Sequence, residues 1–287
     1  MSSDPIDGSN LSPFVLKEIV IEPPKSWFSL RLREVWAYRE LLLFFVWRDI
    51  KVRYKQTVLG VTWAVLQPLL TMVLFSFVFG KLAKIPTDGI PYPIFSYAGL
   101  LPWQLFSRTI TDSATSLVSN QNMVTKIFFP RLILPLSTGL SGLVDFGIAL
   151  LILFGLMVYY TTIPTWRILL LPFLIIFTIF TSMSISLWLS ALAVRYRDIK
   201  FITPFIVQAW LFITPVAYSS SLIPEKWQWL YNLNPMTGVV DGFRWVLFGQ
   251  ASNINNMIFL SIGVVVFVAI TGLIFFQRME LTFADMI

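Results

Sequence analysis

The sequence predicts an all-α, polytopic membrane protein with six transmembrane helices. Hydrophobic residues make up 56% of its 287 residues, charged residues only 13%, and the mean hydropathy is +0.76. A soluble domain usually carries about 25% charged residues, so this chain has too few charges to cover a water-facing surface. Several apolar segments are also long enough to cross a hydrocarbon core of about 30 Å, which takes about 20 helical residues.

The predicted spans occupy the stretches between charged residues. The first lies near 60–80, the third over 135–160 with Asp145 as its only charge, the fourth between Arg167 and Val194, the fifth over 200–219 and the sixth over 256–277. A weaker candidate, 95–118, contains Arg108 and Asp112. We expect it to cross as the second span, because otherwise the neighbouring loops fall on inconsistent sides of the membrane.

The distribution of Lys and Arg predicts the orientation, since cytoplasmic loops carry an excess of these residues. If the N-terminus is inside, the cytoplasmic segments hold 15 of the 21 Lys and Arg, and the outer segments hold five. These cytoplasmic segments are 1–59, 119–134, 195–200 and 278–287. Both termini are therefore predicted to be cytoplasmic. Nine of the 21 precede Gly60, several among Trp and Phe, which fits anionic lipid better than nucleic acid.

An N-terminal amphipathic interface helix is predicted before the first span. Its apolar residues recur at helical spacing, with basic residues on another face. The apolar residues are Leu43, Val46, Trp47, Ile50 and Tyr54, and the basic ones Arg48, Lys51 and Lys55. The pattern is typical of a helix lying in the cytoplasmic interface. A solvated helix on a partner protein is the alternative.

The outer stretch 219–252 is predicted to form a re-entrant helical hairpin. It is too long for a simple connection, and it is rich in Trp with few charges, so a water-exposed loop would show too much apolar surface. We expect two short helices broken near Asn234 and Pro235, at the outer membrane face.

Several absent residues and motifs narrow the function. The chain has no Cys and no His, which excludes disulfides, imidazole and thiolate metal sites and catalysis based on either residue. No G-x-x-x-x-G-K-[ST] loop for ATP phosphates and no Asp-x-Asp pair for a nucleotide sugar is present. Asp112 and Asp145 alone would make a thin proton relay. A transporter driven by a separate ATPase fits better than a secondary transporter or a membrane-embedded glycosyltransferase.

Five sequence blocks occur in order along the predicted spans: R-Y-K-Q-T-V-L-G-V-T-W-A-V-L-Q-P (53–68), K-I-F-F-P-R-L-I-L-P-L (126–136), R-Y-R-D-I (195–199), N-P-M-T-G-V-V-D-G-F-R (234–244) and M-E-L-T-F-A-D (279–285). With these blocks, about residues 40 to 287 resemble the membrane subunit of ABC-2-type polysaccharide exporters. That family exports O-antigen, capsule and teichoic acid chains.

The resemblance implies an architecture, partners and a location. Residues 36–287 would form the ABC-2-type transmembrane domain, in the bacterial cytoplasmic (inner) membrane. Residues 1–35 lie outside the resemblance and are expected to form a cytoplasmic N-terminal extension. The chain would form a homodimer and bind two ABC ATPase subunits, which would hold ATP and Mg. This chain would carry no catalytic residue, metal or cofactor. The cargo would be a lipid-linked glycan, as in lipopolysaccharide biosynthesis, with a small lipid or a drug as the alternative.

Three sets of candidate site residues follow. The ATPase-coupling set is Lys126, Phe128, Phe129, Pro130, Arg131, Arg195, Arg197 and Asp198, for which lipid anchoring and topology-setting charge are alternatives. The substrate-path set is Trp103, Phe106, Arg108 and Asp112; Arg108 and Asp112 share one helix face and could instead form a structural ion pair. The outer-gate set is Trp227, Trp229, Asn234, Pro235, Arg244 and Trp245.

The topology can be tested by cysteine labelling, because the native chain contains no Cys. Thr87→Cys and Ser252→Cys should react with a membrane-impermeant thiol reagent applied to sealed cells, whereas Asn122→Cys should react only after the cells are opened. Labelling of Asn122→Cys from outside would contradict the six-span arrangement.

Overall fold

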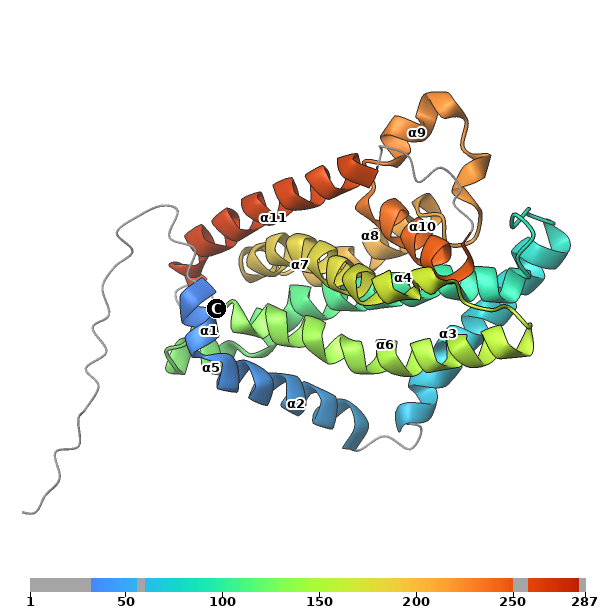
Figure 1. The fold of residues 1–287 in the computed structure, drawn as a ribbon. Helices are drawn as coiled ribbons and strands as arrows, with labels where there is room; N and C mark the ends of the chain where they lie inside the picture. Colours follow the sequence, from blue (N-terminus) through green and yellow to red (C-terminus); the bar gives the residue numbers. More distant parts are fainter. Residues whose placement is uncertain (1–31, 56–59, 250–257, 284–287) are drawn as a thin grey trace, which may run out of the picture.

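The computed structural model describes residues 32–55, 60–249 and 258–283 (Figure 1). Most of the predicted N-terminal extension and Ser252 lie outside these residues. All regular structure in the described ranges is helical. The α-helices are α1 (Leu32–Ala37), α2 (Arg39–Lys55), α3 (Gly60–Phe75), α4 (Tyr92–Ser119), α5 (Gln121–Lys126), α6 (Ile133–Tyr159), α7 (Leu171–Arg195), α8 (Ile199–Ile213), α9 (Glu225–Tyr231), α10 (Pro235–Phe248) and α11 (Ile258–Glu280). A π-helix, η1 (Ser76–Leu82), extends α3, and two 3-10 turns are η2 (Trp166–Leu170) and η3 (Ser220–Leu222).

The all-α, polytopic class is confirmed. Four described helical stretches are long and apolar enough to cross a membrane, namely Thr62–Leu82, Ile133–Tyr159, Trp166–Arg195 and Phe259–Glu280. They match the first, third, fourth and sixth predicted spans. Helices α4 and α8 occupy the second and fifth, but α4 is less apolar and α8 is shorter. The count of six spans therefore stays a prediction.

Helix α4 is the central helix of the bundle. It packs against α3, α6, α7, α8 and α10, and most of its residues are buried. Small hydroxyl side chains such as Ser96, Thr109 and Ser113 are fully buried along it. A helix enclosed by protein can hold polar groups that a lipid-facing helix cannot. This position explains why the second span has the weakest hydropathy pattern.

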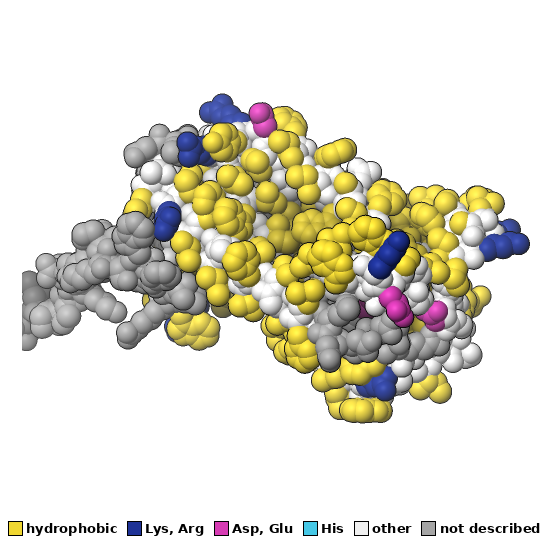
Figure 2. Space-filling view, turned by 90° about the horizontal axis from the view of Figure 1, so that it is seen from above, with side chains coloured by type: hydrophobic (Ala, Val, Ile, Leu, Met, Phe, Trp, Pro, Cys, Tyr) yellow, Lys and Arg dark blue, Asp and Glu magenta, His cyan; other side chains and the backbone are white. Residues whose placement is uncertain are grey.

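The outer surface of the bundle is largely apolar. In Figure 2, hydrophobic side chains cover the middle of the face shown, and the charged side chains lie toward the two ends. Large apolar residues are exposed along several helices, among them Val73 of α3, Leu151 of α6, Phe173 of α7 and Phe267 of α11. Such a surface suits lipid.

The segments predicted to be cytoplasmic meet at one end of the molecule. A cluster of buried side chains there joins Val35 of α1, Phe45 of α2, Val124 of α5, Val194 of α7 and Phe283 after α11. Segments far apart in the sequence thus lie on the same side of the bundle, as an even number of crossings requires. Which side of the membrane this end faces stays a prediction.

At the opposite end, the outer stretch forms two short helices, as predicted. Helix α9 ends at Tyr231 and α10 begins at Pro235. Asn234 accepts a hydrogen bond from the Met236 N–H (3.1 Å), and Pro235 occupies the first turn, where its missing N–H costs nothing. Asn234 therefore caps the N-terminus of α10, at the point where the break between the two helices ends.

Helix α8 ends at Ile213, earlier than the predicted end of the fifth span at 219. Thr214 is extended (φ −94°, ψ 142°), because the residue before a proline avoids the helical region and Pro215 follows. The unwound segment leaves carbonyl groups without helical partners. Inside a membrane protein such groups must be satisfied by other protein atoms.

Arg244 of α10 satisfies these carbonyl groups. Its guanidinium donates hydrogen bonds to the carbonyls of Pro215 (2.6 Å), Val216 (2.8 Å) and Tyr218 (3.3 Å), and to Phe95 of α4 (3.4 Å). The side chain is buried. Burial lowers the pKa of Arg244 to about 10, so the group remains charged at neutral pH. One buried side chain thus ties α10 and the unwound segment to α4.

Gly99 of α4 makes room for this arginine. A Cβ at Gly99 would lie 2.8 Å from Arg244 Nη2 and 3.3 Å from the Val216 backbone. We expect Gly99→Ala to displace the guanidinium and lower the free energy of unfolding by about 1–3 kcal/mol, measured by thermal denaturation in detergent. Gly155→Ala is the matched control, because a Cβ there meets nothing within 4 Å. Equal melting of Gly99→Ala and the parent protein would show that the arginine does not need this space.

Candidate functional site

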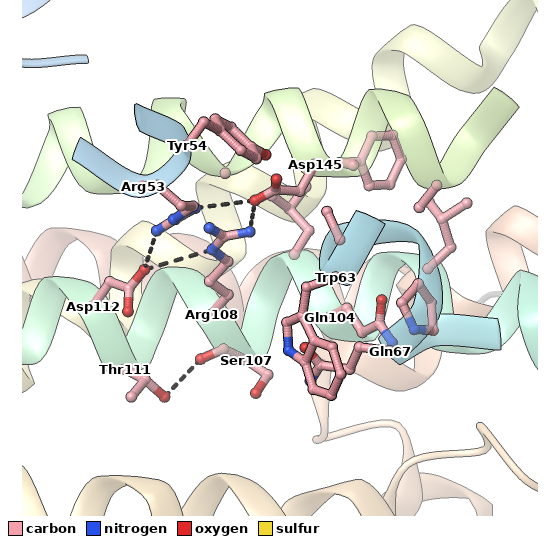
Figure 3. A pocket seen from close by; sticks show the side chains of 17 residues that line it. Arg53, Tyr54, Trp63, Gln67, Gln104, Ser107, Arg108, Thr111, Asp112 and Asp145 are labelled. Carbon is pink, nitrogen blue, oxygen red and sulfur yellow. Dashed lines mark hydrogen bonds and ion pairs between the residues drawn. The ribbon is translucent and has the colours of Figure 1, made fainter. Parts of the chain in front are cut away.

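Four charged side chains from three helices meet inside the bundle (Figure 3). We call Arg53 of α2, Arg108 and Asp112 of α4, and Asp145 of α6 the charge cluster. Arg53 contacts the Oδ2 atoms of Asp112 and Asp145, each at 3.0 Å. Arg108 pairs with Asp112 (Nε to Oδ2, 3.6 Å) and with Asp145. With two positive and two negative side chains, the cluster has no net charge.

Helix α2 brings Arg53 to this position by packing along α6, as Figure 1 shows. Asp145 lies about 18 Å along α6 from its first residue, at 1.5 Å per residue. An isolated charge deep in a membrane costs about 2.5–3.5 kcal/mol or more, so each of these residues needs a partner. The helix predicted before the first span is present, and its C-terminal end contacts the bundle. Its placement in the lipid interface stays a prediction.

A cavity of about 650 Å³ lies beside the charge cluster, between α2, α3, α4 and α6. Its lining combines apolar surface with charged and polar side chains. Besides the cluster it includes Tyr54, Trp63, Gln67, Gln104, Ser107 and Thr111, most of which Figure 3 shows around one space.

Two buried polar atoms on the lining residues make no hydrogen bond within the described part of the chain. They are Tyr54 Oη and Asp145 Oδ1. A buried polar atom without a partner costs about 1–3 kcal/mol. The lining therefore has hydrogen-bonding capacity that the protein itself does not use.

The structure separates the four predicted substrate-path residues. Arg108 and Asp112 line the cavity, but Trp103 and Phe106 are buried in the core, with 4% and 0% of their surface exposed. Their rings lie 5.3 Å apart, and Phe106 meets Trp210 edge-on at 5.3 Å. Because α4 is enclosed by other helices, these aromatic residues pack against protein.

Arg53, Trp63 and Asp145 line the cavity but were not among the predicted site residues. Arg53 and Trp63 both lie in the 53–68 block, but neither its spacing nor its composition predicts a contact with α4 or α6. Asp145 was considered only as the one charge of the third span and, with Asp112, as a thin proton relay. The second predicted span contains both Arg108 and Asp112. A search for charged residues elsewhere in the sequence that could pair with these two could have found Arg53 and Asp145.

The predicted coupling loop after α5 has one exposed phenylalanine and one buried. Phe128 is 64% exposed and Ile127 is 54% exposed. Phe129 is buried, with its ring 5.9 Å from that of Phe45. A contact of both phenylalanines with a partner requires both side chains to be exposed, and this is the case for Phe128 but not for Phe129.

The other residues of this loop divide in the same way. Lys126 is exposed and Pro130 is buried. Arg131 donates its backbone N–H to the Glu280 carboxylate (3.0 Å) and a guanidinium hydrogen bond to the Glu280 carbonyl. Phe129, Pro130 and Arg131 thus hold the loop against the bundle, and Lys126 and Phe128 face outward.

The second predicted coupling turn is exposed throughout. Arg195, Arg197 and Asp198 all face solvent between α7 and α8. Arg197 and Gln121, the first residue of α5, line one cavity of about 480 Å³, so this turn lies beside the start of α5.

The predicted outer-gate residues differ in exposure. Trp227 and Trp229 are about half exposed. Pro235 and Arg244 are buried, and Asn234 accepts a hydrogen bond from Trp210 Nε1 (2.9 Å) besides capping α10. Trp245 is partly buried, with the Arg167 guanidinium 4.8 Å above its ring. Within this set, Trp227 and Trp229 have the surface needed to meet a passing molecule.

The described residues contain no group of three His, Cys, Asp or Glu that could hold a metal ion. The charge cluster is also unsuited to a metal, because each of its carboxylates is paired with arginine.

Comparisons with known proteins point to one family. Residues 40–248 match the family model of the ABC-2 type transporter. The chain is 30% identical to the O-antigen export system permease protein RfbA of Myxococcus xanthus over 76% of this chain and 84% of the relative. It is 27% identical to the protein of the same name from Klebsiella pneumoniae over 90% of this chain and the whole relative. It is also 26% identical to the polysialic acid transport protein KpsM of Escherichia coli over 68% of this chain and 76% of that protein.

The charge cluster can be tested by a double-mutant cycle. Arg53→Gln leaves two carboxylates with one arginine, and Asp145→Asn leaves two arginines with one carboxylate. We expect each single change to lower the free energy of unfolding by about 1–3 kcal/mol, since the side chains are partly exposed. The double variant restores neutrality and should lose less than the sum, by about 1 kcal/mol, in detergent unfolding experiments. Strictly additive losses would show that the charges do not act together. Lys226→Gln with Asp145→Asn is the additive control.

Proposed function

The chain belongs to the ABC-2 type transporter family, and from this membership we propose its specific function. It is the transmembrane subunit of an ATP-driven exporter that moves lipid-linked polysaccharide across the bacterial cytoplasmic membrane. The polar cavity within an apolar bundle is the structural observation that carries this proposal. Three relatives named for O-antigen or polysialic acid transport support the polysaccharide as cargo.

ATP hydrolysis would take place in a separate ABC ATPase subunit. The sequence has no Walker A loop, so a partner must bind ATP and Mg. We propose the cytoplasmic end as its docking surface, formed by Phe128 and Ile127 after α5 and by the turn from Arg195 to Asp198. These residues are exposed at the end of the bundle where Val124 of α5 and Val194 of α7 share one buried cluster, and they combine apolar surface with positive charge. Such patches are typical of protein contacts.

The transporter would contain two copies of this chain. One bundle encloses a cavity of about 650 Å³, which is too small for a polysaccharide chain to pass through. A path of sufficient width would lie between two copies. Helices α3 and α8 have much apolar surface available for such a contact, including Leu70 and Val73 of α3 and Phe205 and Phe212 of α8.

The outer helices α9 and α10 would lie beside the exit of this path, with both termini in the cytoplasm. The exposed rings of Trp227 and Trp229 suit the membrane interface and the faces of sugar rings. The buried residues of the same set would keep these helices in place.

The function is tested by export into inverted inner-membrane vesicles that contain this chain and its ATPase. Lipid-linked glycan made in the same cells with a radioactive sugar should accumulate inside the vesicles only when ATP and this chain are both present. Accumulation without ATP would indicate a secondary transporter. Glycan export that continues in cells lacking the chain would contradict the polysaccharide assignment.

A matched pair of variants tests the docking surface in the same assay. Phe128→Ala should reduce export and co-purification of the ATPase while the free energy of unfolding changes by no more than about 0.5 kcal/mol, because the side chain is exposed. Phe129→Ala should lower the free energy of unfolding by about 3–5 kcal/mol, as expected for a buried phenylalanine. Normal export and ATPase binding in Phe128→Ala would rule out the loop as a contact site.

A further inference from the structure

We propose that the cavity beside the charge cluster is a sugar-binding subsite for the glycan in transit. In this subsite the Trp63 indole packs against a sugar ring, and the polar lining residues bind its hydroxyl groups. The inference rests on the proposed function, and it assigns the contact to residues of α2, α3, α4 and α6.

The lining offers unused hydrogen-bonding groups from several directions. The side-chain amides of Gln67 and Gln104 make no hydrogen bond within the described residues, and each offers two donors and an acceptor. The Tyr54 Oη and Asp145 Oδ1 atoms are buried and unpartnered. Figure 3 shows Gln67 and Gln104 beside Trp63 on one side and Tyr54 beside Asp145 on the other. A ligand with many hydroxyl groups can satisfy all of these atoms, because a hydroxyl both donates and accepts.

The charge of the lining favours a neutral ligand. Among the described residues that line the cavity, the charged ones are the two arginines and two aspartates of the charge cluster, which neutralise one another. To bind a phosphate, the arginines would have to break their ion pairs with the aspartates. To bind a metal ion, the aspartates would have to break the same ion pairs. A hydrocarbon chain would leave the amides and buried oxygens without partners. A neutral sugar leaves the arginine–aspartate pairs intact, and its hydroxyl groups can pair with the amides and the buried oxygens.

Trp63 supplies the apolar wall that a sugar ring requires. It lies on α3, is about half exposed, and is the only tryptophan among the described residues that line this cavity. Its large flat face suits the C–H groups on one side of a sugar ring, while the hydroxyl groups at the ring edge reach the amides. The cavity volume of about 650 Å³ lies within the range of about 300–1,000 Å³ that is usual for small-ligand pockets. A short stretch of glycan therefore fits.

The contact is tested by photo-crosslinking in cells that export the glycan. p-Benzoylphenylalanine replaces Trp63, and in a control protein it replaces Leu151, which is exposed on α6 but does not line the cavity. After irradiation, the Trp63 protein should carry radioactive sugar through purification in denaturing detergent, whereas the Leu151 protein should not. Equal labelling of both proteins, or crosslinks to phospholipid alone, would overturn the proposal.

Export by substituted proteins gives a second measurement. Trp63→Leu keeps an apolar side chain but removes the ring, and Trp63→Phe keeps an aromatic ring. At limiting glycan, export by Trp63→Leu should fall about two- to tenfold, with Trp63→Phe between it and the parent protein. Melting temperatures and co-purification of the ATPase should be unchanged. Normal export by Trp63→Leu, with no crosslink at this position, would reject the subsite and leave the proposed function intact.

Discussion

The structure depends on one constraint: any charge or unpaired backbone group at membrane depth must find its partner within the protein. Two arginines meet this requirement at opposite ends of α4. Arg244 satisfies the carbonyls of the unwound segment after α8, and Arg53 completes the neutralisation of the charges on α4 and α6. Both reach α4 from elements that are distant in sequence. The central helix can therefore be polar, and the surrounding helices can present apolar surface to lipid.

Much of the fold could be predicted because hydrophobic runs and breakers are local signals. Helices occupy all six predicted spans, and α9 and α10 meet at the predicted break near Asn234. The end of α8 at Ile213 was missed, although Pro215 gives a local reason for it. The apolar run continues through the unwound segment, so hydropathy does not show where the helix ends. Hydropathy also does not show that Arg244, about thirty residues later, donates hydrogen bonds to the carbonyls of this segment.

The site was less predictable, because burial depends on which helices surround a residue. Phe128 and Phe129 are adjacent and identical in type, yet only the contact of Phe129 with Phe45 makes one of them internal. Trp103 lies on the predicted path helix but is covered by its neighbours. Arg53 lies in a helix predicted to rest on the membrane surface, and its pairing with Asp145 spans 92 positions of sequence. Such contacts follow from the tertiary packing of α2 on α6.

The neutrality of the charge cluster also has an electrical consequence. A single charge carried across a membrane potential of 100 mV changes the free energy by about 2.3 kcal/mol, and a group of zero net charge changes it by none. Helix movements that displace Arg53, Arg108, Asp112 and Asp145 together therefore do no work against the membrane potential. A movement that withdrew only Arg53 from the cluster would separate one positive charge from the other three residues and carry it through part of the field. With α2 on the cytoplasmic side, as the charge distribution predicts, an energised membrane, negative inside, would favour such a withdrawal of Arg53 and would oppose its return.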